Sequence, residues 1–138
     1  MKRCLSRRIS AIHHSRNAVP SLGRYFYHGI LALIGQTAGA CVGNSSSGIK
    51  ETLSFSCPAI NIGSRQRNRL RGSNVIDVDY DSEKIYQACQ RAITDKEFIA
   101  GFKASPNPYG NGNAGLKIAK ILAETKLDLD LLNKKMTY

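Results

Sequence analysis

The segment 43–51, with the sequence GNSSSGIKE, constrains the fold of this chain more than any other. It places three serines between two glycines, after a short apolar run at 39–42 and before an amphipathic stretch. This order predicts a strand, a tight polar loop and a helix. Such a loop directs backbone N–H groups and hydroxyls at the helix N-terminus, where the helix dipole favours a phosphate. A capped helix after a serine-rich turn is the structural alternative.

Glu51 adds a carboxylate to this loop, and the pattern predicts that it lies about one turn into the helix. A carboxylate next to a phosphate is unfavourable because like charges repel. We therefore expect Glu51 to accept hydrogen bonds from sugar hydroxyls. The loop and the carboxylate together predict a site for a nucleotide or a nucleotide-sugar.

Three further motifs follow in order: CPAINIG at 57–63, which leads into SRQ at 64–66, NVIDV at 74–78, and NPYGNGNA at 107–114. With segment 43–51, they resemble the C-terminal part of the hydrolysing UDP-N-acetylglucosamine 2-epimerases, over residues 41–124. The resemblance implies that Ser45 and Ser46 bind the pyrophosphate, Glu51 the ribose hydroxyls and Arg65 the nucleotide. The predicted UDP-binding set is completed by Asn44, Ser47, Gly48 and Gln66.

The length of 138 residues allows only part of such an enzyme. The resemblance implies a two-domain, glycosyltransferase-B-like architecture, of which this chain matches the later strands of the second domain. The family's first domain carries the acidic residues thought to move protons, and this chain has no Asp or Glu before Glu51. We therefore predict a UDP-binding portion with no catalytic residue, which takes UDP or UDP-N-acetylglucosamine. A non-catalytic UDP-binding module or remnant is the alternative.

The expected fold is α/β, with a partial Rossmann-like parallel sheet of about three strands and flanking helices, the second half of the C-terminal domain in that architecture. Strands are predicted near 40–43, 59–62 and 74–78, and helices over 25–36, from 83, over 96–103 and over 114–125. Ligands bind such sheets outside the carboxyl ends of the strands. Unpaired sheet edges lead us to expect self-association or a requirement for the missing N-terminal domain.

The charge is unevenly distributed along the chain. Residues 1–50 hold seven basic and no acidic side chains, whereas residues 51–138 hold thirteen basic and ten acidic ones. The net charge of +10 thus comes mainly from the start of the chain, which argues against a nucleic-acid-binding protein. We divide the chain into a basic stretch at 1–20, a partial nucleotide-binding domain at 21–125 and a tail at 126–138. A degenerate or misread start is favoured over an organellar transit peptide, because SLGR at 21–24 already resembles the family.

Four arginines at alternate positions predict an extended loop with all four side chains on one side. Apart from Arg65, they are expected to make surface or domain contacts; the four are Arg65, Arg67, Arg69 and Arg71. In the last loop, Tyr109 is expected to be a packing aromatic. The resemblance implies that this loop lies near the cleft and that the helix after it leans toward the first domain.

Cysteine and histidine spacing predicts no metal site, and we predict no cofactor. Cys41, Cys57 and Cys89 lie in apolar surroundings and are expected to be buried free thiols, as is typical of the reducing cytoplasm. No charge-free apolar stretch resembles a membrane span, because 25–42 is interrupted by glycines and polar residues.

Overall fold

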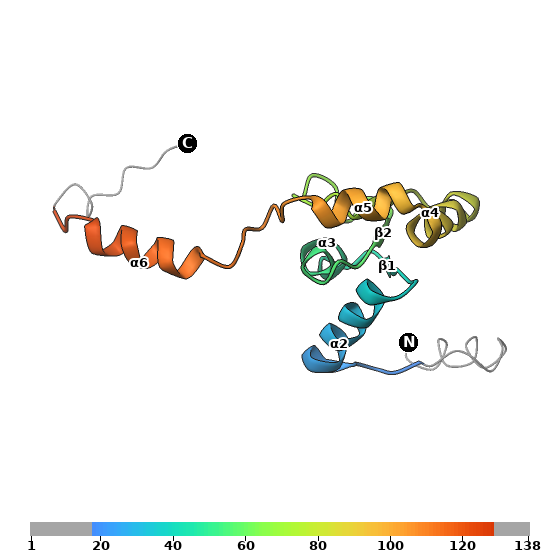
Figure 1. The fold of residues 1–138 in the computed structure, drawn as a ribbon, viewed down its shortest axis with the longest axis horizontal. Helices are drawn as coiled ribbons and strands as arrows, with labels where there is room; N and C mark the ends of the chain where they lie inside the picture. The colour runs from blue at the N-terminus through green and yellow to red at the C-terminus, as the bar shows by residue number, and fades with distance from the viewer. Residues whose placement is uncertain (1–17, 129–138) are drawn as a thin grey trace.

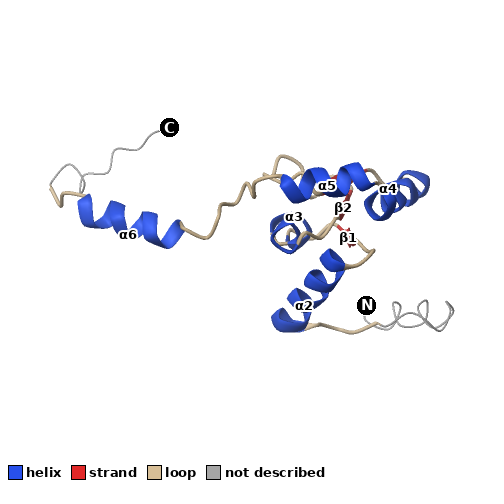
Figure 2. Ribbon diagram, viewed as in Figure 1, coloured by secondary structure: helices blue, strands red, loops and turns tan. Residues whose placement is uncertain are grey.

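A computed structural model describes residues 18–128 of the chain. Figures 1 and 2 show helices α4 and α5 above the strands and helix α2 below them. In chain order, the elements are α2 (Gly23–Gln36), β1 (Cys41–Gly43), α3 (Ser47–Lys50), the 3-10 helix η1 (Thr52–Phe55), β2 (Ala59–Ile62), β3 (Val75–Val78), α4 (Ser82–Thr94), α5 (Lys96–Ala104) and α6 (Ala114–Glu124). The α/β class and the three predicted strands are confirmed.

The sheet has the order β1-β2-β3, and both pairs of neighbouring strands are parallel. Cys41 pairs with Ala59, and Ala59 pairs in turn with Val75. All three strands therefore present their carboxyl ends at the same edge of the sheet. The loops that follow them, at 44–46, 63–74 and 79–81, meet at that edge.

The core lies between the central strand and helix α4. Ile60 of β2 packs with Ala88 and Ala92 of α4, and all three are at most 5% exposed. The small alanines let the helix approach the sheet closely. Asp81 is the N-cap of α4, because its carboxylate accepts hydrogen bonds from the backbone N–H groups of Glu83 and Lys84.

A buried polar network joins the other side of the sheet to α3 and η1. The side-chain nitrogen of Asn74 donates to Oγ1 of Thr52 at 2.8 Å and to the carbonyl oxygen of Cys57 at 2.7 Å. Thr52 donates its own hydroxyl to the carbonyl oxygen of Gly48 at 2.7 Å. Asn74 and Thr52 have no exposed surface, so this network fixes the serine-rich segment relative to the start of β3.

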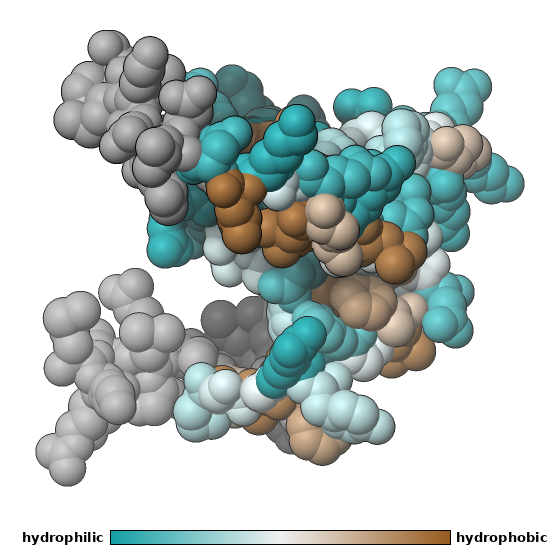
Figure 3. Space-filling model, turned by 90° about the vertical axis from the view of Figure 1, so that its left-hand side faces the viewer, coloured by the Kyte–Doolittle hydropathy of each residue, from teal (hydrophilic) through white to brown (hydrophobic). Residues whose placement is uncertain are grey.

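Helix α6 stands apart from the rest of the domain in Figure 1. None of its residues is buried, and Figure 3 shows a band of hydrophobic surface where α6 faces the viewer. Its exposed apolar side chains are Leu116, Ile118, Ile121 and Leu122. Asn113 occupies the N-cap position as predicted, although its side chain makes no capping hydrogen bond.

Two further predictions concern the segments at the ends of the chain and the lack of a membrane-spanning stretch. The basic stretch at 1–20 and the tail at 126–138 lie largely outside the described residues. Within residues 18–128, no helix combines the length and the apolar character needed to cross a bilayer.

Candidate functional site

The serine-rich segment leaves β1 through a tight turn and enters a helix of a single turn. The chain turns at Gly43, with φ at +155°, and α3 then spans only Ser47–Lys50. Glu51 is the C-cap of α3, and it thus lies about one turn after the start of the helix. A four-residue helix has only a weak dipole, so the helix N-terminus contributes little to anion binding here.

The serines themselves form a compact local turn. Oγ of Ser45 accepts a hydrogen bond from the backbone N–H of Ser47 at 3.3 Å. The backbone carbonyl of Ser45 accepts a second one from the backbone N–H of Gly48 at 3.1 Å. Ser46 is the N-cap of α3, without a side-chain capping bond. Gly48 faces Cys41, since an added Cβ would lie 3.9 Å from its sulfur. The capping expected of a serine-rich turn thus falls to Ser45.

A pocket of about 1010 Å³ opens between α2 and the α3–η1 segment. Three members of the predicted UDP-binding set line it: Ser45, Ser47 and Glu51. From α2, Tyr27 and His28 line the same pocket. The structure therefore brings two of the three predicted serine hydroxyls and the carboxylate into one cavity, whereas Ser46 and Arg65 do not line it.

Helix α2 makes direct hydrogen bonds to this group, which sequence reasoning missed. Oγ of Ser47 donates to the hydroxyl of Tyr27 at 2.7 Å. Nε2 of His28 lies 2.8 Å from Oε2 of Glu51. The helical spacing of Tyr27, His28 and the buried Leu31 was the available signal, because positions three and four apart share one face of a helix.

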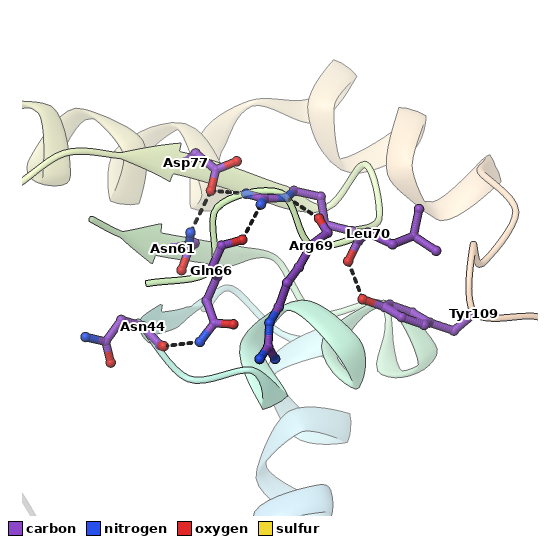
Figure 4. A network of polar contacts seen from close by, with 8 residues as sticks. Asn44, Asn61, Gln66, Arg69, Leu70, Asp77 and Tyr109 are labelled. Atoms are coloured by element: carbon purple, nitrogen blue, oxygen red, sulfur yellow. Dashed lines mark hydrogen bonds and ion pairs between the residues drawn. The ribbon is translucent and has the colours of Figure 1, made fainter. Parts of the chain in front are cut away.

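A second group of predicted residues joins two strand-end loops. Gln66 is 2% exposed, and its side-chain nitrogen donates to the backbone carbonyl of Asn44 at 2.7 Å. Nη1 of Arg65 lies 3.5 Å from Oδ1 of the same asparagine. Figure 4 shows Gln66 reaching from the loop after β2 to Asn44, which follows β1. The buried Gln66 thus holds Asn44, which immediately precedes Ser45.

The predicted extended arginine loop is wrong. Residues 65–68 form turns, and Asn68 has φ at +64°. The Arg71 side chain is only 22% exposed, because its guanidinium group pairs with Asp77, donates to the carbonyl of Gln66 at 2.6 Å and donates to the carbonyl of Arg69 at 3.2 Å. These bonds fold the loop back on itself. The four arginines therefore do not share one side.

The loop that contains Tyr109 is tied to the same region. Its hydroxyl donates to the carbonyl of Leu70, as Figure 4 shows. Asn107 donates from its side chain to Oγ of Ser54 at 3.0 Å, and Ser54 lines the large pocket. Through Asn107, this loop thus contacts a residue of the large pocket. Tyr109 is 42% exposed, so it anchors the loop through its hydroxyl more than through packing.

The thiols near the site are not activated nucleophiles. Burial raises the pKa of Cys57 to about 11 and raises the pKa of Cys41. Burial also raises the pKa of the Tyr27 phenol, although the hydrogen bond from Ser47 opposes this shift. All three described cysteines are free, but only Cys57 is buried, so the expectation of full burial is wrong for Cys41 and Cys89. Among residues 18–128, no group of three acidic, histidine or cysteine side chains could hold a metal ion.

A family model described as UDP-N-acetylglucosamine 2-epimerase matches residues 1–123. The chain is 38% identical over 94 residues to the polysialic acid biosynthesis protein P7 of Escherichia coli, covering 68% of this chain and 24% of that protein. It is also 38% identical over 97 residues to a UDP-N,N'-diacetylbacillosamine 2-epimerase (hydrolyzing) of Legionella pneumophila, covering 70% of this chain and 24% of that protein. The chain thus spans about a quarter of the length of these relatives.

Proposed function

Because the chain belongs to the UDP-N-acetylglucosamine 2-epimerase family, we propose that it forms the UDP-binding portion of a hydrolysing UDP-sugar 2-epimerase. One observation carries the proposal: Ser45, Ser47 and Glu51 line one pocket beside the carboxyl end of a parallel strand. That edge is where ligands bind open α/β sheets. Hydroxyls suit a phosphate and a carboxylate suits ribose hydroxyls, so the pocket supplies both halves of a nucleoside diphosphate site.

The proposed division of labour leaves proton transfer outside this chain. The full reaction would convert UDP-N-acetylglucosamine and water to N-acetylmannosamine and UDP. It requires groups that remove and return a proton at the sugar and assist departure of UDP. Glu51 is the only carboxylate among the described residues that line the large pocket, and its proposed partner is the ribose. We therefore propose that the chain binds UDP and does not turn over the sugar nucleotide by itself.

Calorimetric titration of the full chain with UDP tests the proposal. Glu51→Ala and Arg65→Ala should each weaken binding, whereas the matched controls Glu97→Ala and Arg67→Ala should not. Glu97 is exposed on α5, outside the pocket, and Arg67 is exposed in the same loop as Arg65. Loss of a hydrogen bond to a charged group predicts about a tenfold loss of affinity or more. A folded chain that binds no UDP would refute the proposal.

Turnover separates the two forms of the proposal. If the purified chain converts UDP-N-acetylglucosamine, it is a complete catalyst and the division of labour is wrong. If it binds UDP without turnover, two explanations remain: the chain is a non-catalytic UDP-binding module, or it is one part of an incomplete enzyme. Addition of a separately expressed N-terminal domain from a relative would then distinguish these two, since only an incomplete enzyme can regain activity.

We also infer a role in sialic-acid-type amino-sugar synthesis, in the cytoplasm. The similarity to a protein named for polysialic acid biosynthesis supports the pathway. The similarity to a diacetylbacillosamine epimerase supports a second sugar class. Comparing UDP-N-acetylglucosamine with its diacetamido analogue in the same titration tests which sugar nucleotide binds more tightly. The free thiols of Cys41, Cys57 and Cys89 suit a reducing compartment.

A further inference from the structure

We propose that His28 is a positioning residue that orients the Glu51 carboxylate toward the ribose hydroxyls of a bound uridine nucleotide. The inference rests on the proposed function, because it assigns a specific task within the same pocket. It concerns a residue of α2, a helix that precedes the serine-rich segment in the sequence and lines the same pocket.

The contact between the two side chains defines the geometry. Nε2 of His28 lies 2.8 Å from Oε2 of Glu51. A carboxylate only accepts hydrogen bonds, so Nε2 carries the proton and donates it. Among residues 18–128, no partner is recorded for the other oxygen, Oε1. One oxygen is therefore held by the protein, and the other is free to accept from a ligand in the pocket that both residues line.

The imidazole is itself held in place. Its centroid lies 5.2 Å from that of Phe55 of η1 and 6.0 Å from that of Tyr27. One turn along the same face of α2, Leu31 is 1% exposed and anchors the helix. His28 thus contacts η1 through its ring and the C-cap of α3 through its nitrogen. These contacts restrict the His28 imidazole, which donates to the more mobile Glu51 carboxylate.

Glu51 needs such a partner because its own backbone position does not fix its carboxylate. It lies at the junction of α3 and η1, and its side chain is 42% exposed. A free glutamate has three rotatable bonds and loses that freedom when it binds a ligand. The hydrogen bond from His28 removes part of this freedom before the ligand arrives, and preorganisation of this kind raises affinity.

The basic side chains around the pocket do not take this role. Arg24 and Lys50 also line the pocket, but neither forms an ion pair with Glu51 within residues 18–128. His28 is thus the only recorded hydrogen-bond partner of the carboxylate in this part of the chain. The two cations remain free to contact the negative charge of a diphosphate.

Two substitutions and two ligands test the inference on the full chain. His28→Phe keeps an aromatic ring against Phe55 and removes the donor, whereas His28→Gln replaces the ring with an amide that can donate to Glu51. The ligands are UDP and 2′,3′-dideoxy-UDP, which lacks both ribose hydroxyls. Calorimetry measures the affinity of each variant for each ligand. Circular dichroism and thermal melting establish that each variant folds.

We expect His28→Phe to weaken UDP binding about fivefold, the effect of one net hydrogen bond. It should leave the affinity for dideoxy-UDP unchanged, and His28→Gln should restore UDP affinity to within about twofold of the original. Equal weakening of both ligands by His28→Phe would show a merely structural role and overturn the inference. Unchanged UDP affinity in His28→Phe would overturn it as well. If the unaltered chain binds UDP, the proposed function stands in either case; if it binds none, both fall.

Discussion

Replacing Asn74 with alanine should destabilise the domain strongly and disturb the serine-rich segment with it. Asn74 has no exposed surface, and its side-chain nitrogen holds both Thr52 and the carbonyl of Cys57. Thr52 in turn holds the carbonyl of Gly48. One side chain at the start of β3 thus fixes the segment that supplies Ser45, Ser47 and Glu51 to the pocket.

The magnitude follows from what the substitution removes and what it leaves behind. Two hydrogen bonds contribute about 1 kcal/mol each, and an unsatisfied buried acceptor costs about 1–3 kcal/mol more. Against this, Oδ1 of Asn74 has no partner, so its removal returns about 1 kcal/mol. The net destabilisation is about 2–4 kcal/mol. Because 1 kcal/mol corresponds to about 4–8 °C in a domain of about 100 residues, Tm should fall by about 10–30 °C.

Thermal melting followed by circular dichroism measures this change. Asn74→Asp should be worse than Asn74→Ala, because it places a buried oxygen against two oxygen acceptors. Asn113→Ala is the control, because the Asn113 side chain makes no capping bond to α6. A decrease of less than about 3 °C for Asn74→Ala, or an equal decrease for Asn113→Ala, would show that the buried network does not hold the fold in this way.

Three further predictions concern the backbone, acid stability and association. Gly63→Ala should destabilise the fold by more than about 1 kcal/mol, because Gly63 has φ at +76° and an added Cβ would overlap the Tyr80 ring. Gly101→Ala in α5, where an added Cβ meets nothing, should be neutral or stabilising. Urea titration measures the stability of both variants, and the reverse order of stability would contradict the geometry. The pKa of Asp95 lies below its ordinary 3.8, chiefly because the Asp95 carboxylate accepts a hydrogen bond from the backbone N–H of Phe98. The stability that this carboxylate contributes is present above pH 3.8 and is lost as the pH falls below that value, so Asp95→Asn should flatten the profile of stability against pH below about pH 4. Parallel profiles for the two proteins would exclude this contribution. The outer edges of β1 and β3 pair with no strand within residues 18–128, so sedimentation velocity should detect association; a monodisperse monomer that melts cooperatively would refute it.

The sequence predicts the framework of this fold well, because the framework follows local patterns. Each strand is a short apolar run that ends in turn residues, and the observed strands agree with the predicted ones within one residue at each end. Helix α4 begins where an aspartate precedes an amphipathic stretch. Such signals need no knowledge of distant parts of the chain.

The errors occur where distant contacts override local propensity. The helix predicted after the serine-rich loop forms one α-helical turn, Ser47–Lys50, and then the 3-10 helix η1, before Ser56 adopts φ at +52°. Asn74, which lies 22 residues after Thr52 in the sequence, donates a hydrogen bond to Thr52 at the start of η1 and so fixes this change of helix type. The arginine loop is likewise shaped by the pairing of Arg71 with Asp77. Alternation within the loop could not reveal either contact.

The candidate site depends on contacts of the same long-range kind, which explains why its residues could be proposed from the sequence but its assembly could not. Ser45 and Glu51 belong to one local motif, so their roles could be proposed from the sequence. The side chains that contact this motif come from elsewhere: His28, 23 residues before Glu51, bonds to the Glu51 carboxylate, and Gln66, 22 residues after Asn44, donates to the Asn44 carbonyl. The pocket is therefore a property of three segments together. Substitution of His28 in α2 or of Gln66 in the loop after β2 should thus weaken ligand binding, as a substitution in the serine-rich segment does, even though neither side chain need touch the ligand.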